Sequence, residues 1–161
     1  MSRLDHDRYF LVMAKVVALR STCKSRQVGA VLTDINNYVL STGYNGPAKG
    51  LNTCEPCRRI GKSIGESLED CMAVHAEQNA LLQCPDVKRI HTLYVTTSPC
   101  ITCLKMLFNT PCKVIMFIDE YPESMVTDLW KQSGRLYINK PFTPECTEIL
   151  SSLSRIAELM P

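Results

Sequence analysis

Long apolar runs are missing from this sequence. No stretch approaches the 18 apolar residues of a membrane-spanning helix, and the opening MSRLDHDR has no apolar core of a secretory signal. We therefore expect a soluble cytoplasmic protein with no membrane partner. A strong charge excess is also missing, because the net charge is only +2. A broad nucleic-acid surface usually needs a basic excess, so we expect no nucleic-acid partner.

Internal repeats, low-complexity segments and domain linkers are absent as well. A chain of 161 residues with 45% hydrophobic and 21% charged residues has the composition of an ordinary globular protein with a real core. We therefore expect residues 1–161 to form a single domain.

The nine cysteines are the unusual feature of the composition. Their number is odd and no secretory signal precedes them, which argues against a framework of disulfides. In a reducing compartment, clustered cysteines more often bind metal. Three stand alone, Cys84, Cys112 and Cys146, and we expect them to be buried free thiols.

Hydrophobic periodicity and turn residues predict an ordered series of helices and strands. An N-terminal helix reaches Leu19, and a hairpin follows. Residues 45–70 form an irregular loop, rich in glycine and proline, of a length that is usually functional or pinned. The remaining elements are helix 74–84, strand 91–97, a helix from Ser98-Pro99, strand 113–119, helix 125–132, strand 135–139 and a closing helix from Thr143 to about 159. A hairpin followed by alternating helices and strands predicts an α/β fold, a three-layer α/β/α sandwich.

A Cys-x-x-Cys motif lies in the first turn of the helix after Ser98-Pro99. Cys100 and Cys103 have the spacing of two thiolates that bind one tetrahedral Zn²⁺, although a redox pair would have the same spacing. His75 lies at the start of the preceding helix, and adjacent helix starts converge at the carboxyl ends of the strands in such a sheet. Three protein ligands leave a fourth position for water, which is the catalytic arrangement of zinc.

Glu77 follows His75 at a spacing of two, which places the two side chains on different sides of a helix. It therefore need not be a ligand and can move protons beside the bound water. The order His-Ala-Glu followed by Pro-Cys-Ile-Thr-Cys matches the H-x-E…P-C-x-x-C signature of zinc nucleobase deaminases. The two halves together argue for a zinc-water enzyme against a helix cap or a redox pair.

The sequence also resembles the deoxycytidylate (dCMP) deaminases, particularly their bacterial and phage forms, in which case the location would be the host cytoplasm. The resemblance extends from the first helix to about Tyr121 and weakens beyond it. It rests on RSTC (20–23), RQVGA (26–30), STGYNGPAKG (41–50), HAEQNA (75–80) and TSPCITC (97–103). It implies a cytidine-deaminase-like fold with a five-stranded mixed sheet.

The resemblance implies the reaction dCMP plus water to dUMP plus ammonia, supplying dUMP for dTMP synthesis. A zinc held by His75, Cys100 and Cys103 acidifies its water, and Glu77 carries protons from that water to N3 and then to the leaving amino group. Six residues are candidates for binding the substrate: Ala76 and Ser98 for the pyrimidine, Asn45 for the sugar, Arg26 and Ser21 for the phosphate, and Tyr121 at the border of the pocket.

Four further cysteines are candidates for a second, structural zinc. Closed sites of four thiolates pin loops, and this one would tie the loop of about residues 45–71 to the body of the domain. Some members of the family bind a second zinc with counterparts of two of these residues, Cys23 and Cys54. The candidate ligands are Cys23, Cys54, Cys57 and Cys71.

The segment GYNGPAKG resembles the part of regulated dCMP deaminases that binds a triphosphate effector. The resemblance implies activation by dCTP with Mg²⁺, inhibition by dTTP, and a homo-oligomer, a hexamer in particular. The implied effector-binding residues are Gly43, Tyr44, Gly46 and Lys49. Turn geometry alone would also account for the glycines.

Other functions compatible with the zinc motif stay open. One is a zinc deaminase acting on another cytosine or adenine substrate, such as a free nucleoside, dCTP or a nucleic acid. The other is a non-catalytic zinc scaffold, against which Glu77 argues because a structural zinc has no use for it.

Overall fold

The computed structural model describes residues 3–52, 54–62, 70–121 and 124–159. Its central sheet has five strands in the order β2-β1-β5-β6-β7. The strands β2 and β1 form the predicted hairpin and β1 is antiparallel to β5, whereas β5, β6 and β7 run parallel. The strands are β1 (Gly29–Thr33), β2 (Val39–Tyr44), β5 (Thr92–Thr97), β6 (Val114–Asp119) and β7 (Leu136–Asn139).

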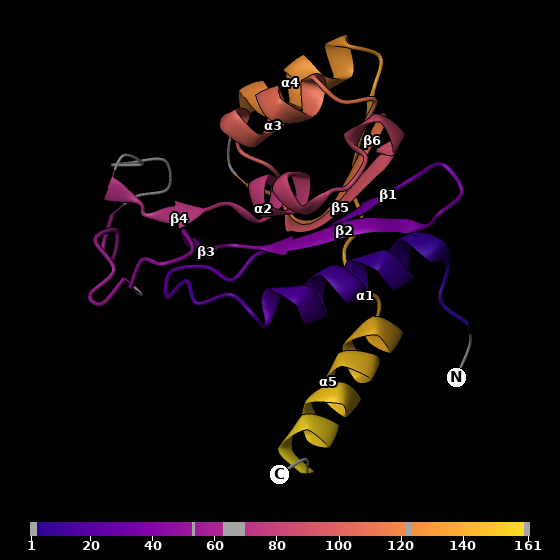
Figure 1. The fold of residues 1–161 in the computed structure, drawn as a ribbon. Coiled ribbons are helices and arrows are strands. Elements are labelled where there is room, and N and C mark those ends of the chain that lie inside the picture. The colour runs from indigo at the N-terminus through magenta and orange to yellow at the C-terminus, as the bar shows by residue number, and fades with distance from the viewer. Residues whose placement is uncertain (1–2, 53, 63–69, 122–123, 160–161) are drawn as a thin grey trace.

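Helices cover both faces of the sheet, which confirms the predicted three-layer sandwich with a five-stranded mixed sheet (Figure 1). Helix α1 lies on one face, and α2, α3 and α4 lie on the other (Figure 1). The short 3-10 helix η2 (Val87–Arg89) leads into β5. The helices are α1 (His6–Ala18), α2 (Ala76–Gln83), α3 (Ile101–Phe108), α4 (Ser124–Gln132) and α5 (Pro144–Leu159).

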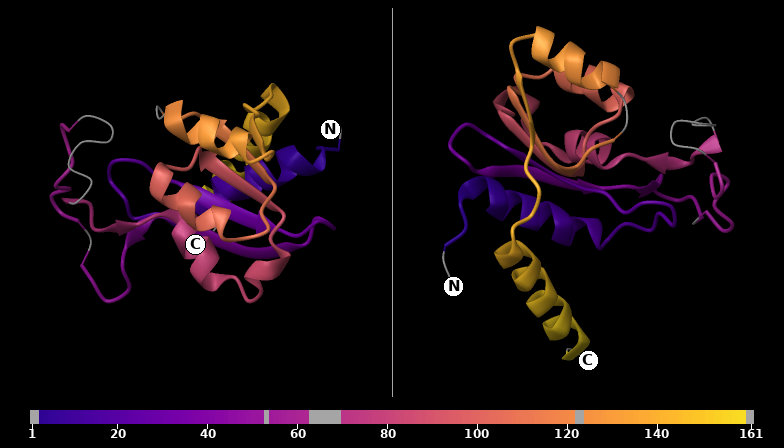
Figure 2. Two further views of the ribbon diagram at one scale, coloured as in Figure 1. Left: turned by 90° about the horizontal axis from the view of Figure 1, so that it is seen from above. Right: turned by 180° about the vertical axis from the view of Figure 1, so that it is seen from behind.

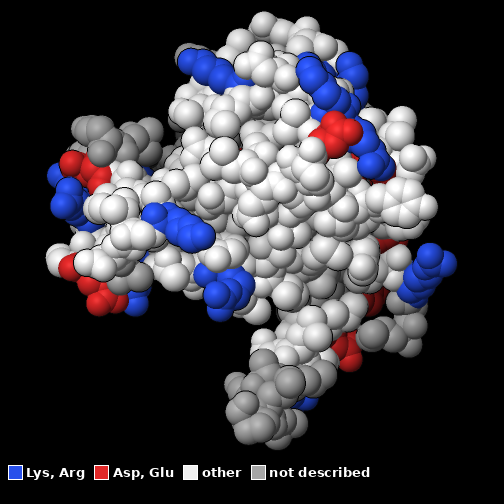
Figure 3. Space-filling model, viewed as in Figure 1, with Lys and Arg blue, Asp and Glu red and all other residues white. Residues whose placement is uncertain are grey.

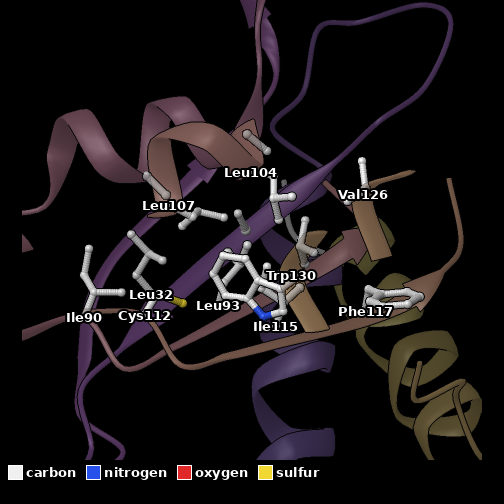
Figure 4. Packing of buried hydrophobic residues seen from close by; sticks show 14 residues of the cluster. Leu32, Ile90, Leu93, Leu104, Leu107, Cys112, Ile115, Phe117, Val126 and Trp130 are labelled. Carbon is white, nitrogen blue, oxygen red and sulfur yellow. The ribbon is translucent and has the colours of Figure 1, made fainter. Parts of the chain in front are cut away.

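Alternating side chains of the inner strands form a separate core on each face, as the two-residue period of a strand requires. In β1, Leu32 packs under α2 and α3, whereas Val31 points to the opposite core with Phe10 and Leu11 of α1. The larger core includes Trp130 of α4, which is fully buried against Leu104 and Ile115 (Figure 4). This packing fixes the helix starts at one end of the sheet.

Two short strands, one at the start of the predicted irregular loop and one just after its end, have no signal in the sequence. Strand β3 (Gly46–Pro47) pairs with β4 (Ala73–Val74) in an antiparallel ladder. Each is two residues long, too short to show periodicity. The pairing holds the two ends of the loop together immediately before His75, so the loop is closed at its base by backbone hydrogen bonds.

Helix α5 departs from the sandwich. The sequence predicts a closing helix with an apolar stripe, and the helix forms over Pro144–Leu159, but it extends beyond α1 and away from the body (Figures 1 and 2). Cys146 at its start is buried, whereas Leu153, further along the stripe, is 43% exposed. Periodicity therefore identifies the helix but not what covers its apolar side.

None of the described helices is both long enough and apolar enough to cross a membrane.

Candidate active site

His75 caps helix α2 instead of belonging to it. Its backbone is extended (φ −72°, ψ 157°), and the Gln78 side chain accepts a hydrogen bond from the His75 N–H at 2.8 Å, as in half of a capping box. The helix begins at Ala76, two residues later than predicted. His75 and Glu77 are thus a cap residue and a first-turn residue, which explains their spacing of two: the imidazole projects from the cap while the carboxyl lies on the helix.

Cys100 caps helix α3 in the same way, with φ −74° and ψ 168°, and Cys103 lies in the first turn. The Leu104 N–H donates to the Cys100 carbonyl at 2.9 Å, which starts the helix. The helix dipole favours anionic groups at this end, so a thiolate at the cap residue Cys100 is stabilised there.

The three predicted ligands meet at the ends of these two helices. His75 Nδ1 lies 3.4 Å from Cys100 Sγ and 3.3 Å from Cys103 Sγ. Among the described residues, this is the one group of three or more His, Cys, Asp or Glu ligand atoms that all lie within 4.8 Å of one another. One nitrogen and two sulfurs at these distances fit a tetrahedral zinc with a fourth position left for a small molecule.

The electrostatics of the triad favour a thiolate at Cys100 that accepts hydrogen bonds from the other two side chains. A hydrogen bond from Cys103 and one from His75 lower the pKa of the Cys100 thiol to about 4, against the effect of burial. The hydrogen bond with Cys100 raises the pKa of His75 above its usual value. The Cys103 thiol has a raised pKa because it donates to Cys100 and is buried. A divalent cation bound by the three side chains would displace the protons of the hydrogen bonds between them.

Glu77 is buried beside the triad, with only 4% of the residue exposed. Burial raises the pKa of its carboxyl to about 7, while hydrogen bonds and the His75 charge partly oppose this effect. No salt bridge of the described residues involves Glu77, so this buried carboxyl has no ion-pair partner among them. Such a group next to a metal triad is typical of a proton-transfer residue.

One cavity brings most of the predicted site residues together. It is lined by the segment after α1, by the segments next to β3 and β4, and by the starts of α2 and α3. The predicted residues that line it are Cys23, Arg26, Asn45, Cys57, Cys71, His75, Ala76, Glu77, Ser98, Cys100 and Tyr121. Cys103 is fully buried beneath them, and Ser21 and Cys54 do not reach the cavity.

Asn45 fastens the loop after α1. Its Oδ1 accepts hydrogen bonds from Ser21 Oγ at 2.7 Å and from the Val28 N–H at 2.8 Å, and its Nδ2 donates to the Arg26 carbonyl at 2.8 Å. The residue is 8% exposed and still borders the cavity. Ser21, predicted to bind phosphate, donates its hydroxyl to Asn45 and does not line the cavity in this structure.

Ser98 and Tyr121 form another wall. The Ser98 Oγ accepts a hydrogen bond from the Tyr121 N–H at 2.6 Å, and the Ser98 N–H donates to the Asp119 carbonyl at 2.9 Å. The Arg26 guanidinium lies over the Tyr121 ring, 5.7 Å from its centroid. Since the Ser98 N–H is engaged in this way, a contact between its backbone and a base would be made by its carbonyl.

The four cysteines predicted to bind a second zinc do not assemble a site. No three of their sulfur atoms lie within 4.8 Å of one another in the described part of the chain. Three of them line the cavity, and the Lys24–Glu55 ion pair at 3.1 Å joins the segments that carry Cys23 and Cys54.

The four predicted effector residues lie outside the cavity, along β2 and the segment that follows it. Gly43 has a packing role, because a Cβ there would lie 2.2 Å from the Ala76 carbonyl oxygen of α2. The Tyr44 carbonyl accepts a hydrogen bond from Asn79 Nδ2 at 2.7 Å. Gly46 is buried in β3, and Lys49 is exposed.

Arg59 is a cavity residue that the sequence reasoning missed. It lines the cavity from the loop between β3 and β4, and its charge lowers the pKa of His75. The available signal was the pair of arginines directly after Cys57. It was missed because an irregular loop has no period from which to tell which residue of the pair turns inward.

On the face seen in Figure 3, Lys and Arg gather in small groups near the edges, some next to Asp or Glu, and the middle of the face is largely uncharged. A nucleic-acid groove on this face would need a continuous row of basic side chains.

Comparisons with known proteins agree with this geometry. The family model for the cytidine and deoxycytidylate deaminase zinc-binding region matches residues 4–118. The chain is 42% identical over 128 residues to the deoxycytidylate deaminase of Mycobacterium phage D29, an alignment that covers 74% of this chain and 99% of that protein. It is 34% identical over 149 residues to the deoxycytidylate deaminase of Schizosaccharomyces pombe, covering 89% of this chain but 46% of that protein, so it spans about half the length of that relative.

Among solved structures, the fold resembles the dCMP deaminase of cyanophage S-TIM5 in complex with dCMP and dUMP. The TM-score is 0.70 at 26% sequence identity, and the match covers 87% of this chain and 100% of that one. The family match runs from α1 into β6 and includes the whole triad and Glu77. The chain therefore belongs to the cytidine and deoxycytidylate deaminase family.

Proposed function

We propose that this protein is a zinc-dependent dCMP deaminase that converts dCMP and water to dUMP and ammonia. The observation that carries the proposal is the buried Glu77 next to the His75, Cys100 and Cys103 triad, in a cavity that also contains arginine. The likeness to the phage enzymes, one of them in complex with dCMP and dUMP, supports the same substrate. We also propose that residues 1–161 act as one domain, with the loop of about residues 45–71 inserted in it.

The residues of the chain have distinct tasks in this reaction. When bound by the triad, zinc supplies the Lewis acidity that lowers the pKa of water. The Glu77 carboxylate takes one proton of the attacking water and gives it to N3 of cytosine as the oxygen adds at C4. It then takes the second proton from the hydroxyl now on C4 and gives it to the amino group, which leaves as ammonia while the C4 carbonyl forms. A single buried carboxyl can do both because it reaches the water and the base from one position.

The binding residues orient the nucleotide for that proton transfer. Ala76 and Ser98 present backbone atoms to the pyrimidine from the starts of α2 and α3, and Asn45 borders the position of the sugar. Arg26 provides a guanidinium for the phosphate, and the ring of Tyr121 supports it from one side.

A substrate panel tests the proposal. Ammonia release is measured with dCMP, deoxycytidine, dCTP and a cytosine-containing single-stranded oligonucleotide. We expect rapid turnover of dCMP alone. Preferred turnover of the oligonucleotide would replace the proposal by a nucleic-acid deaminase, and no turnover of any of the four by zinc-loaded protein would replace it by a zinc scaffold.

We further propose regulation by dCTP with Mg²⁺ as activator and dTTP as inhibitor. The segment from Gly43 to Gly50 contacts α2 through the hydrogen bond between Asn79 and the Tyr44 carbonyl, so a ligand bound there would act on the helix that carries Glu77. Equal dCMP turnover with and without each effector would rule this regulation out.

Two proposals concern composition and assembly. Cys23, Cys57 and Cys71 border one cavity, which supports a second, structural zinc with Cys23, Cys54, Cys57 and Cys71 as its ligands. A metal assay that gives one zinc per chain instead of two would exclude it. The exposed Leu153 on the apolar stripe of α5 supports a homo-oligomer, for which the family resemblance suggests a hexamer, and sedimentation would test this by mass.

A further inference from the structure

One arginine in the cavity would not balance the negative charge that a bound dCMP brings. A phosphate monoester has close to two negative charges at neutral pH, and Glu77 adds an acidic group to the same cavity. Of the described residues that line the cavity, two have a guanidinium, Arg26 and Arg59. Arg26 is the residue to which the proposed function assigns the phosphate, and Arg59 has no role in it.

The loop between β3 and β4 directs Arg59 inward. The Ile60 N–H donates to the Cys57 carbonyl and the Lys62 N–H donates to the Arg59 carbonyl, both at 3.2 Å, so the chain turns twice within six residues. Arg59 is half-buried at the cavity, whereas its neighbour Arg58 is exposed and does not line it. Two adjacent arginines in one turn are thus separated into a cavity residue and a surface residue.

The two cavity arginines come from different loops. Arg26 follows α1, and its carbonyl is held by Asn45 Nδ2 at 2.8 Å, while Arg59 belongs to the loop whose base is closed by β3 and β4. A guanidinium donates two parallel hydrogen bonds to a phosphate, and two of them match both the charge and the acceptors of a dianion.

We propose that Arg59 is a second phosphate-binding residue and sets the preference of the site for a nucleoside monophosphate over the free nucleoside. The inference rests on the proposed function of the same cavity. It adds a specificity residue contributed by the loop of about residues 45–71, and so gives that loop a task in substrate selection.

The test compares Arg59→Ala with Arg58→Ala, which removes the same side chain one position away on the surface. The values of kcat and KM are measured for dCMP and for deoxycytidine, with zinc content determined for each variant. We expect Arg59→Ala to lower kcat/KM for dCMP by about 10- to 100-fold, mainly through KM, because one charge-assisted contact is lost. Its kcat/KM for deoxycytidine should change by less than about threefold, since that substrate has no phosphate.

Arg58→Ala should leave both substrates near wild type, and Arg59→Lys should recover part of the dCMP activity because it restores the charge without the fork. A binding assay with the product dUMP gives the same comparison without turnover.

Three results would overturn the inference. An equal loss of kcat/KM for dCMP and deoxycytidine in Arg59→Ala would make Arg59 a structural residue of the loop. The same kcat/KM for dCMP in Arg59→Ala and Arg58→Ala would mean that other groups bind the phosphate. In both cases the proposed function survives, because wild type still deaminates dCMP. A zinc-loaded wild-type protein with no activity on dCMP would overturn the proposed function and this inference together.

Discussion

In the proposed function, the residues of the triad and its surroundings divide into metal ligands, a proton carrier and supports. His75 and Cys100 are cap residues of two helices, and Cys103 lies one turn inside the second. Cap residues have extended backbones, so their side chains project beyond the helix end toward a common point. Glu77 is inside its helix and approaches the same point from the side.

Glu77→Gln is expected to separate catalysis from metal binding. The amide cannot carry the proton, so kcat for dCMP should fall by about 10²-fold to 10⁴-fold or more. Zinc content should stay that of the wild type because Glu77 is not one of the three ligands. Ammonia release and a metal assay on the same preparation check this, with Cys103→Ser as the comparison that should lose both. Loss of zinc in Glu77→Gln would make the glutamate a ligand.

Asn45→Ala is expected to damage the cavity wall and not only a substrate contact. It leaves the half-buried Val28 N–H without its acceptor, which costs roughly 1–3 kcal/mol, whereas the Ser21 hydroxyl keeps the backbone carbonyl of residue 45 as an acceptor at 2.8 Å. The free energy of unfolding from urea titration should fall, and the KM for dCMP should rise as Arg26 loses its anchor. A raised KM with unchanged stability would limit Asn45 to contacting the substrate.

At the scale of elements, the position of the catalytic helix depends on a close approach to the sheet. Helix α2 lies on β2 at Gly43, where a Cβ would come within 2.2 Å of the Ala76 carbonyl oxygen and 2.3 Å of the Ala80 nitrogen. Both atoms belong to the helix backbone and cannot move alone. Gly43 therefore sets the height of α2 above the sheet, and with it the positions of His75 and Glu77.

Gly43→Ala should lift this helix. We expect a loss of roughly 1–3 kcal/mol of stability from overpacking, together with a fall in kcat for dCMP. Gly50→Ala is the matched control: its φ of +90° makes alanine strained, but a Cβ there meets nothing within 4 Å. Calorimetry and ammonia release on both variants check the comparison. Full activity in a stable Gly43→Ala would show that the helix has room to adjust.

The turn between β1 and β2 is held by the Asp34 carboxylate. Its Oδ1 accepts from the Asn36 and Tyr38 N–H groups, each at 2.9 Å, and Arg89 pairs with Oδ2. The hydrogen bond from Tyr38 is the largest cause of a pKa below the usual value, and the bonds from Arg89 and Asn36 add to it. The hairpin is thereby stabilised by the ionised form of the carboxyl.

This stabilisation should depend on pH. Because the folded pKa is lowered, the contribution is complete above the unfolded pKa of about 3.9 and is lost as the pH falls through the folded value. Urea unfolding of wild type and Asp34→Asn should therefore give a large difference in stability at neutral pH that shrinks in acid. A difference that is independent of pH would mean that the aspartate acts by its shape and not by its charge.

At the scale of the whole molecule, the helices and strands long enough to show a hydrophobic period were predictable from the sequence. The hairpin, the parallel strands and the helices all form near their predicted residues, and the triad with Glu77 follows from motif spacing. What spacing could not give is the β3–β4 ladder, the inward turn of Arg59 and the direction of α5. The first two depend on backbone pairing and turns in a segment without periodicity, and the third on what packs against an apolar stripe.

The central claim, zinc-dependent deamination of dCMP, is tested most directly by one experiment on the purified chain. Ammonia and dUMP are measured with excess dCMP before zinc removal by a chelator, after it, and after zinc is returned. The account predicts equal amounts of both products, loss of turnover with the metal, and recovery when zinc is restored. Zinc-loaded protein that releases no ammonia from dCMP, or turnover that persists without metal, would contradict it.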